Sequence, residues 1–316
     1  LNAHPNKQKF SKWIRNKKIS VKDLFPKLKE SEFYKIDLSV GSEWVGGRNE
    51  IEDLNLFQFK IDKLQKKYPK KIIAGGYLEP RAIYTSDTYE KTGNYGAENR
   101  TIHLGLDFWL PPETKVSAMF DGEVVTAVND QGDKEYGGLV ILKHNIEDLE
   151  FYTLYGHNTV ESVLKNKIGS KVDKGDVIAE IANYPENGNW APHLHFQIML
   201  SMLDYRIDYP GVCYFNQIDV WKDLCPDPNL IFKSKGLDLD LSDSEDELIK
   251  YRNIHLGKSL KLHYEEPLHI VRGEGVYLMD NYGRKFLDTV NNVAHVGHEN
   301  ESVVAKGKSQ MSILNT

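Results

Sequence analysis

Hydrophobic residues in the first 75 positions recur at helical spacing between lysine-rich stretches. Phe10, Trp13 and Ile14 share one face of a predicted helix. A second helix is predicted before Pro69, because apolar side chains repeat there every three or four residues, at Leu54, Phe57, Ile61, Leu64 and Tyr68. We therefore expect residues 1–75 to form a partly helical N-terminal region that concentrates no candidate catalytic residues.

From about residue 76 the pattern changes to short β-type runs separated by Gly, Asn and Asp. Residues 116–128 turn at Asp121-Gly122, a dipeptide typical of a β-hairpin. Further strands are predicted over residues 138–144, 149–157, 171–181 and 193–200. Residues 76–235 are therefore expected to form a mainly β domain of antiparallel sheet.

The last third of the chain changes character twice. Residues 236–260 contain the acidic run LDLDLSDSEDELIKYR, which predicts a solvated linker leading into a helix. Residues 261–316 begin a different pattern, in which VYLMDNYGRKFLD alternates around an Asn-Tyr-Gly turn and predicts a hairpin.

Composition narrows the class of protein. The net charge of -6 does not suggest a nucleic-acid surface. No apolar run approaches the roughly 20 residues of a transmembrane helix. Cys213 and Cys225 are the only cysteines and are read as free thiols. Because the chain starts at Leu1 without a signal-peptide pattern, we expect a piece of a longer protein, and the compartment cannot be read from this end.

Two histidines stand one residue apart in the apolar stretch APHLHF, residues 191–196. On a strand, His193 and His195 would point to the same face of the sheet. Burying two imidazoles side by side costs free energy unless they have partners. A metal or a reaction is therefore expected at this position.

A second element supplies the remaining metal ligands. His103 precedes Asp107 by four residues, with Gly105 between them to keep the turn open. Together with one histidine of the HxH pair, they make two imidazoles and one carboxylate. That set, with a fourth position left for water, is typical of a catalytic zinc site and not of a closed structural one.

A third element, LYGHN, ends a β run with His157. This histidine and the unused member of the HxH pair could move the proton of a water and stabilise an oxyanion. No HExxH helix is present, which excludes a helical zinc protease with a glutamate base. A single histidine is more often structural, and His144 keeps that interpretation. A lipoyl-like carrier, suggested by GSKVDKGDVIAEI, lacks a modifiable lysine at a hairpin tip.

In order along the chain, RTIHLGLDFWLPPETKV, AMFDGEVV, YTLYGHN, GSKVDKGDVIAEI and APHLHFQI resemble zinc metallopeptidases of the lysostaphin and LytM type, over about residues 77–200. The resemblance implies an antiparallel β-sheet groove and a peptide or peptidoglycan substrate. It implies that zinc is bound by His103, Asp107 and His195, and that His193 and His157 act on the water and the transition state.

The tail, PLHIVRGEGVYLMDNYGRKFLDTVNNVAHVGHENESVVAKGKSQMSILNT, resembles the beginning of a class III pyridoxal-phosphate-dependent aminotransferase. The resemblance is strongest to the branch that contains phospholyases acting on phosphorylated amines. It implies that pyridoxal phosphate belongs to the full-length protein and not to this fragment, and that His295 and His298 are part of the aminotransferase architecture. We expect the tail to be mobile, or to pack on the peptidase domain or on a second copy of the chain.

Two functions are carried forward. The first is a zinc metalloendopeptidase that hydrolyses peptide bonds, in peptidoglycan cross-bridges or stem peptides by resemblance. The second is a non-catalytic peptide-binding or scaffolding module within a multi-domain pyridoxal-phosphate enzyme. Cell-wall peptidases work in the cell envelope and pyridoxal-phosphate enzymes in the cytoplasm, and we expect a cytoplasmic location.

Overall fold

The fold was analysed in a computed structural model of the chain. It describes residues 4–29, 32–84, 87–93, 96–238, 245–262, 264–289 and 295–314. The acidic run at 239–244 and the apolar residue Val290 lie outside the described residues.

An eight-stranded sheet forms the centre of the protein, in the strand order β1-β2-β5-β12-β9-β8-β7-β10. Every neighbouring pair is antiparallel except β1 and β2, which are parallel. The strands are β1 Glu32–Ile36, β2 Lys71–Gly75, β5 Leu106–Trp109, β7 Gly122–Asp130, β8 Gly137–Ile146, β9 Leu149–Asn158, β10 Lys171–Val172 and β12 Leu194–Met199. The expectation of a mainly β, largely antiparallel fold is confirmed.

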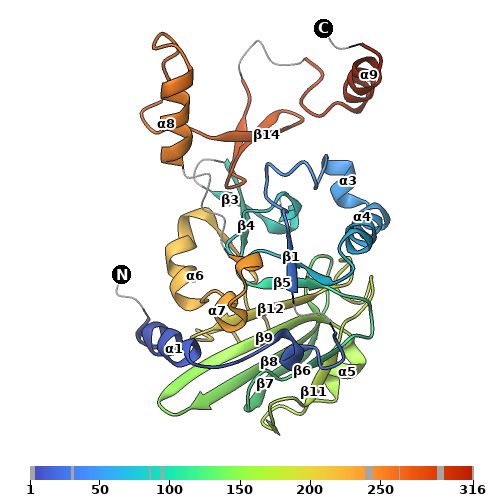
Figure 1. Cartoon of the computed structure of the whole chain (residues 1–316), viewed down its shortest axis with the longest axis vertical. Coiled ribbons are helices and arrows are strands. Elements are labelled where there is room, and N and C mark those ends of the chain that lie inside the picture. The colour runs from blue at the N-terminus through green and yellow to red at the C-terminus, as the bar shows by residue number, and fades with distance from the viewer. Residues whose placement is uncertain are drawn as a thin grey trace.

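Three smaller sheets surround the central one (Figure 1). One pairs β6 (Lys115–Ser117) with β11 (Val177–Glu180), and a second joins β3 (Glu90–Gly93), β4 (Gly96–His103) and β13 (Val212–Tyr214). The third belongs to the tail and contains β14 (Ile270–Glu274), β15 (Tyr277–Asp280) and β16 (Lys285–Leu287). The hairpin predicted around Asn-Tyr-Gly is confirmed by the antiparallel pairing of β15 with β16.

The hairpin predicted at Asp121-Gly122 is wrong. The strands on either side, β6 and β7, belong to different sheets and do not pair. Gly122 is needed there for space and not for a left-handed turn, since a Cβ on it would lie 2.8 Å from the Lys143 carbonyl oxygen and 2.8 Å from His144 Nδ1. The glycine thus allows β7 to approach β8 closely.

The predicted N-terminal helices are confirmed as α1 (Pro5–Arg15) and α4 (Leu54–Lys67). Helix α1 starts with proline in its first turn, and its buried Phe10 meets Phe151 of β9 with ring centroids 5.2 Å apart. The Asp53 side chain caps α4 by accepting from the Leu56 amide at 3.0 Å. The region also supplies β1 and β2, so it extends the same sheet that carries the histidine motifs.

The remaining helices are short. They are α2 Val21–Leu24, α3 Arg48–Glu52, α5 Val160–Leu164, α6 Ile218–Leu224, α7 Asn229–Phe232, α8 Glu245–His255 and α9 Glu301–Met311, with 3-10 turns at Ala82–Tyr84, Asp87–Tyr89, Phe215–Gln217 and Lys235–Leu237. Within the described part of the chain, none of the helices has the length and apolar character needed to cross a bilayer. Cys213 and Cys225 are buried free thiols, as expected.

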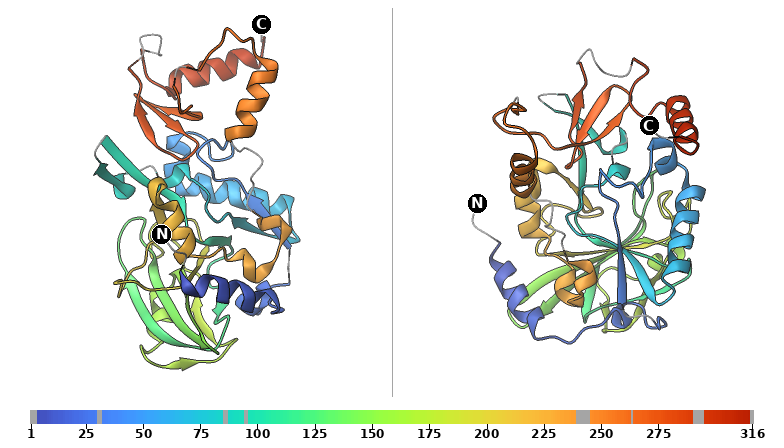
Figure 2. Two further views of the ribbon diagram at one scale, coloured as in Figure 1. Left: turned by 90° about the vertical axis from the view of Figure 1, so that its left-hand side faces the viewer. Right: turned by 45° about the horizontal axis from the view of Figure 1, so that its top comes forward.

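The tail packs against the rest of the chain, which was one of the expected arrangements (Figure 2). The Arg272 guanidinium on β14 donates to the carbonyl oxygens of Val40 and Gly46, each at 2.8 Å. At the hairpin turn, the Thr101 hydroxyl donates to the Tyr282 carbonyl oxygen. Helix α9, in contrast, is exposed along its whole length.

His144 is fully buried on β8 and has a structural role, as expected from the sequence. Its Nδ1 donates to the Asp121 carbonyl oxygen at 2.9 Å, and its Nε2 lies 2.7 Å from the Thr153 hydroxyl. Burial lowers the pKa of His144 from 6.5 to about 4. Between these two values the unfolded chain binds more protons than the folded protein.

We therefore expect the His144 contribution to stability to be constant above pH 6.5 and to decrease as the pH falls to about 4. At 1.36 kcal/mol per pKa unit, the loss is about 3 kcal/mol. Urea unfolding of the wild type and of His144→Gln at several pH values measures it. The variant should lose about 3 kcal/mol less between pH 7 and pH 4. The exposed-histidine control His255→Gln should follow the wild type, and equal pH dependence in all three proteins would contradict the assignment.

Candidate metal centre

Three strands bring the sequence-predicted metal ligands together. His103 is the last residue of β4, Asp107 lies on β5 and His195 on β12. Asp107 is directly opposite His195 in the antiparallel pairing of β5 with β12. All three side chains are buried, with exposed fractions of 0%, 1% and 3%. They are the group of described residues whose ligand atoms lie close enough to hold one metal ion.

Gly105 has a different role from the one expected. Its backbone does not adopt the left-handed conformation, so the turn itself does not require glycine. A Cβ at this position would lie 2.7 Å from His195 Cε1 and 2.7 Å from the Phe196 carbonyl oxygen. Gly105 is therefore needed because β12, which carries His195, passes close to it.

The three candidate ligand atoms form a small triangle. His103 Nε2 lies 2.9 Å from His195 Nδ1, and Asp107 Oδ1 lies 3.1 Å from His195 Nδ1 and 3.3 Å from His103 Nε2. Ligand atoms on a tetrahedral zinc with bonds of 2.0–2.1 Å are about 3.4 Å apart. A shift of a few tenths of an ångström would convert the triangle into one face of a zinc tetrahedron.

Hydrogen bonds behind the rings fix the tautomers of both histidines. His103 Nδ1 donates to the Gly76 carbonyl oxygen at 2.9 Å. His195 Nε2 donates to the Gln197 side-chain oxygen at 3.0 Å, and the Gln197 amide nitrogen donates to the Pro210 carbonyl oxygen. Each ring therefore points a lone pair, and not a proton, into the triangle.

The chemistry of this donor set fits a metal cation. Two imidazole lone pairs and one carboxylate oxygen face one another in a buried site, and none of the three atoms carries a proton to share. Such a group of acceptors repels itself unless a cation lies between them. Nitrogen and oxygen donors of this kind suit zinc.

The pKa values of His103 and Asp107 also favour the protonation states that bind a metal. Burial, reinforced by the nearby Arg81, lowers the pKa of His103 to about 3. Burial alone would raise the pKa of Asp107, but the fixed positive charge of the neighbouring Arg81 helps to outweigh it and to hold that pKa well below the usual value. The two side chains are thus neutral and anionic, respectively, which are the forms that bind metal.

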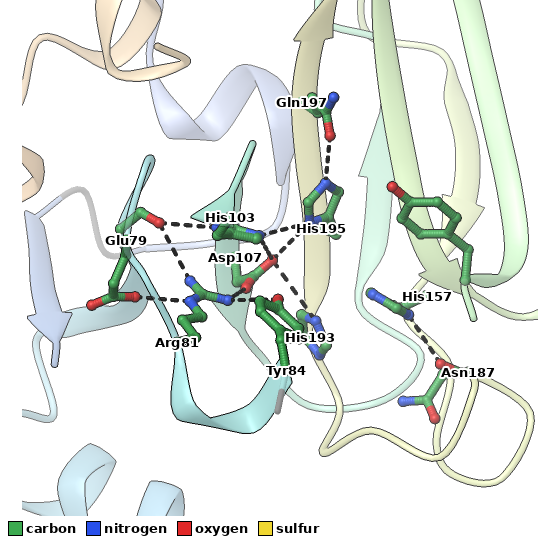
Figure 3. A network of polar contacts seen from close by, with 12 residues as sticks. Glu79, Arg81, Tyr84, His103, Asp107, His157, Asn187, His193, His195 and Gln197 are labelled. Atoms are coloured by element: carbon green, nitrogen blue, oxygen red, sulfur yellow. Dashed lines mark hydrogen bonds and ion pairs between the residues drawn. The ribbon is translucent and has the colours of Figure 1, made fainter. Parts of the chain in front are cut away.

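His193 and His157 flank the triangle. His193 precedes β12 and does not lie on it, but its Nε2 still reaches within 3.8 Å of Asp107 Oδ1. His157 lies near the end of β9 with a positive φ of 67°, and its ring centroid is 4.3 Å from that of His193. Figure 3 shows both rings beside the three candidate ligands.

Both flanking rings expose an acceptor nitrogen. The Nδ1 atom of His193 donates to the Ala191 carbonyl oxygen at 2.7 Å, and that of His157 donates to the Asn187 carbonyl oxygen at 3.0 Å. Each Nε2 atom therefore keeps a lone pair. Burial lowers the pKa of both imidazoles, so each is in the form that can accept a proton.

Sequence reasoning missed Arg81 and Glu79. The fully buried Arg81 guanidinium pairs with Asp107 Oδ2 and, at 2.8 Å, with Glu79 Oε2. The signal was present in YLEPRAIY, where an acid and a base stand two residues apart in an apolar stretch. Like His193 and His195, two charged side chains in an apolar stretch cost free energy unless they have buried partners, so this pair could have been predicted in the same way.

The centre opens into a groove of about 570 Å³. Aromatic side chains supply much of its wall: Phe57, Tyr84, Tyr89, Trp109, Tyr136 and Trp190. Charged side chains, among them Arg48, Arg100, Lys134 and Glu135, also line it. The groove therefore offers both aromatic and charged contacts to a ligand beside the metal-ligand triangle.

Residues 101–205 match the family described as Peptidase family M23. All five sequence-predicted site residues lie inside this range, whereas Arg81 and Glu79 lie before it. The chain therefore contains a domain of peptidase family M23.

Solved structures of peptidases are similar to part of the chain. The catalytic domain of the antimicrobial peptidase lysostaphin from Staphylococcus simulans is 24% identical, with 39% of this chain and 80% of that chain covered and a TM-score of 0.27. A zinc-containing peptidase from Vibrio cholerae is 23% identical, with 35% and 30% covered and a TM-score of 0.25. Similarity at this level carries no argument about function.

Two curated relatives that match part of the chain are not peptidases. "Alanine--glyoxylate aminotransferase 2-like" of Drosophila melanogaster is 49% identical over 74 residues, which are 23% of this chain and 15% of that protein. "Ethanolamine-phosphate phospho-lyase homolog 1" of Caenorhabditis elegans is 34% identical over 70 residues, 22% of this chain and 15% of that protein. The chain thus spans about a seventh of the length of these relatives, in agreement with a short class III aminotransferase-like segment.

The triangle predicts one bound metal ion per chain. We expect zinc added to the metal-free protein to bind with a stoichiometry of one, and His195→Ala to reduce its affinity by at least about 100-fold, because an open three-residue site loses a direct ligand. Titration against a chromophoric chelator measures both values. His255→Ala, which removes an exposed histidine of α8, should bind as the wild type does. Undiminished binding by His195→Ala would exclude this residue as a ligand.

Proposed function

We propose that this chain is a zinc metalloendopeptidase that hydrolyses peptide bonds with an activated water. The observation that carries the proposal is the convergence of three acceptor atoms, two of them from groove-lining residues, with two further acceptor nitrogens beside them. A structural zinc site would be closed by a fourth protein ligand, whereas this triangle leaves one side open to the groove. The M23 family match supports the same reaction class.

His103, Asp107 and His195 would hold the zinc, which when bound supplies Lewis acidity toward a carbonyl oxygen. The remaining steps fall to the two flanking histidines. His193 Nε2 can take a proton from the attacking water, because its Nδ1 proton is already committed to the Ala191 carbonyl oxygen. His157, whose ring centroid lies 4.3 Å from that of His193, can share the proton released by the water and, while it carries that proton, stabilise the developing negative charge.

The rings are held in place for these roles. His193 stacks on Trp109, with ring centroids 5.5 Å apart and the planes inclined by 22°. Trp190 meets the edge of the same ring at 6.3 Å. Packed aromatic neighbours of this kind restrict the imidazole to a narrow range of orientations, which favours proton transfer along one direction.

The substrate class follows from the groove and the resemblance. A groove lined by aromatic and charged side chains suits an extended peptide with small side chains near the cleaved bond. By resemblance, we propose peptidoglycan cross-bridges or stem peptides as the substrate. We place the reaction in the cytoplasm because the aminotransferase-like segment belongs to a class of cytoplasmic enzymes. A cleaved secretion signal on the full-length protein would contradict this location.

A second candidate is a non-catalytic peptide-binding module within a multi-domain pyridoxal-phosphate enzyme. The observation that favours it is the aminotransferase-like match, which joins the M23 domain to an unrelated enzyme class. In that case the groove would bind peptides without cleaving them. Turnover separates the two functions.

Removal of His193 should separate metal binding from catalysis. We expect His193→Ala to retain one zinc per chain, because its ring nitrogen is not part of the triangle, and to lose at least about 100-fold in kcat, as expected for loss of a general base. Cleavage of oligoglycine and stem peptides, followed by mass spectrometry, measures turnover. His144→Gln serves as a buried-histidine control and should keep its activity. Zinc-loaded wild-type protein that cleaves none of a broad peptide panel would favour the binding module.

We also infer that residues 261–316 neither hold pyridoxal phosphate nor take part in peptide hydrolysis in this chain. A cofactor site needs a phosphate-binding loop and a partner for the pyridine nitrogen, which a large domain supplies. Mixing the protein with pyridoxal phosphate, followed by dialysis, should leave no Schiff-base absorbance. Cleavage of the chain after about residue 240 should leave peptide turnover within about twofold of the intact protein, since none of the described tail residues lines the groove. A stable stoichiometric adduct, or loss of turnover, would contradict this inference.

A further inference from the structure

We propose that Arg81 is a positioning residue of the metal centre, which restricts Asp107 to one metal-binding oxygen and helps to fix the ring of His103. This inference rests on the proposed zinc site. Neither Arg81 nor its partner Glu79 lies in the range matched by the M23 family. Arg81 donates to Oδ2 of Asp107, whereas Oδ1 faces the two candidate histidine ligands (Figure 3).

The guanidinium is fully buried, and each of its nitrogens has a partner. Nε donates to Glu79 Oε2 at 2.8 Å, while Nη1 donates to Asp107 Oδ2 and, at 3.1 Å, to the Tyr84 hydroxyl. Nη2 points to the Gly76 carbonyl oxygen at 3.4 Å. A planar, always charged fork with several donors is suited to hold so many acceptors at once, which a lysine ammonium could not do in the same geometry.

The two oxygens of Asp107 are divided between two tasks. Oδ2 accepts from Arg81, and Oδ1 faces the ring nitrogens of His103 and His195. With Oδ2 engaged, only Oδ1 is free for a metal. The carboxylate is therefore fixed as a ligand through one oxygen, which keeps the coordination number low and a position open for substrate.

Arg81 also contacts the carbonyl oxygen that orients a second candidate ligand, His103. The Gly76 carbonyl oxygen accepts from His103 Nδ1 at 2.9 Å and faces Arg81 Nη2. The same oxygen thus orients the imidazole and the guanidinium. Arg81 therefore connects two of the three candidate ligands.

A buried cation next to a metal needs compensation. Arg81 by itself would repel a divalent ion and reduce the charge gained from Asp107. Glu79 offsets the guanidinium charge and is held in turn by the Leu38 amide, which donates to Oε1 at 3.1 Å. Glu79, Arg81 and Asp107 together carry one net negative charge, so the site still attracts a cation.

The backbone leaves space for this arrangement. A Cβ on Gly75 would lie 2.5 Å from Arg81 Nη2 and 2.9 Å from Trp109 Cη2. Gly75 is opposite Asp107 in the pairing of β2 with β5. Strand β2 therefore has a glycine at the position that leaves space for the Arg81 guanidinium beside Asp107.

The competing explanation is that Arg81 and Glu79 form a buried ion pair that serves only the fold. A double substitution distinguishes the two explanations. Breaking a buried pair at one partner is strongly destabilising, whereas replacing both partners by apolar residues is often neutral. If Arg81 only serves the fold, Glu79→Met/Arg81→Met should restore both stability and metal binding. If Arg81 positions Asp107, the double variant should recover only the stability that an unpaired Glu79 costs, because Asp107 still lacks its donor, and metal binding should not recover.

The experiment titrates Co²⁺ into metal-free full-length chains and follows the visible spectrum and the affinity, with urea unfolding of the metal-free proteins alongside. We expect Arg81→Met to be less stable than the wild type and to bind Co²⁺ about 10–100-fold more weakly, as for other partners of metal ligands. The double variant should be more stable than Arg81→Met, because Glu79 is no longer left unpaired, but it should keep the weaker affinity. Its absorption should be weaker per ion, because Asp107 can then use both oxygens and raise the coordination number.

Two further variants complete the test. Arg81→Lys keeps the charge and should fold, but it should still bind Co²⁺ more weakly because one ammonium cannot reach all partners. Lys60→Met removes a partly buried cation that does not line the groove and that donates to the Trp44 carbonyl oxygen, and it should bind as the wild type does. Wild-type affinity and spectrum in the double variant would overturn the role of Arg81. A wild type that takes up neither Co²⁺ nor Zn²⁺ would overturn the metal centre itself and this inference with it.

Discussion

The pairing of β5 with β12 is the constraint on which the centre depends. It places Asp107 opposite His195, while Leu106 and Phe108 on the same strand point into the main apolar cluster. Because side chains alternate along a strand, a slip of one residue would bury the carboxylate among hydrophobic residues and expose phenylalanine to the groove. The cost of burying an unpaired carboxylate in the core specifies the register strongly, and so the geometry of the centre.

Buried charge has to be balanced, and this protein balances it in layers. The innermost layer holds the acceptor atoms of the triangle. Behind them lie the direct hydrogen-bond partners, such as Gln197 for His195 and Arg81 for Asp107, and behind Arg81 lies Glu79. Each layer restricts the conformations of the one inside it. Rigidity of the ligands is thus obtained from polar contacts in a region where apolar packing could not supply it.

The parts of the structure that the sequence predicted are local. The spacing of His103 and Asp107, the HxH pair and the helical repeat around Phe57 each depend on residues close together in the chain, so periodicity and motif spacing were sufficient. The parts that it did not predict depend on distant contacts. Gly122 was read as a turn residue, but its smallness serves the approach of β7 to β8. The role of Arg81 depends on its contact with Asp107, which lies 26 residues away in the chain.

The backbone of His157 has a consequence for how this domain could drift over generations. Its φ of 67° is a conformation that glycine or asparagine adopts more easily than histidine. Stability alone would therefore favour replacement of this residue, and only a demand on its imidazole opposes that drift. If the proposed peptidase reaction were lost in a lineage, this position would be among the first to change, whereas the hydrogen-bonded histidines of the triangle would persist for as long as metal stabilised the fold.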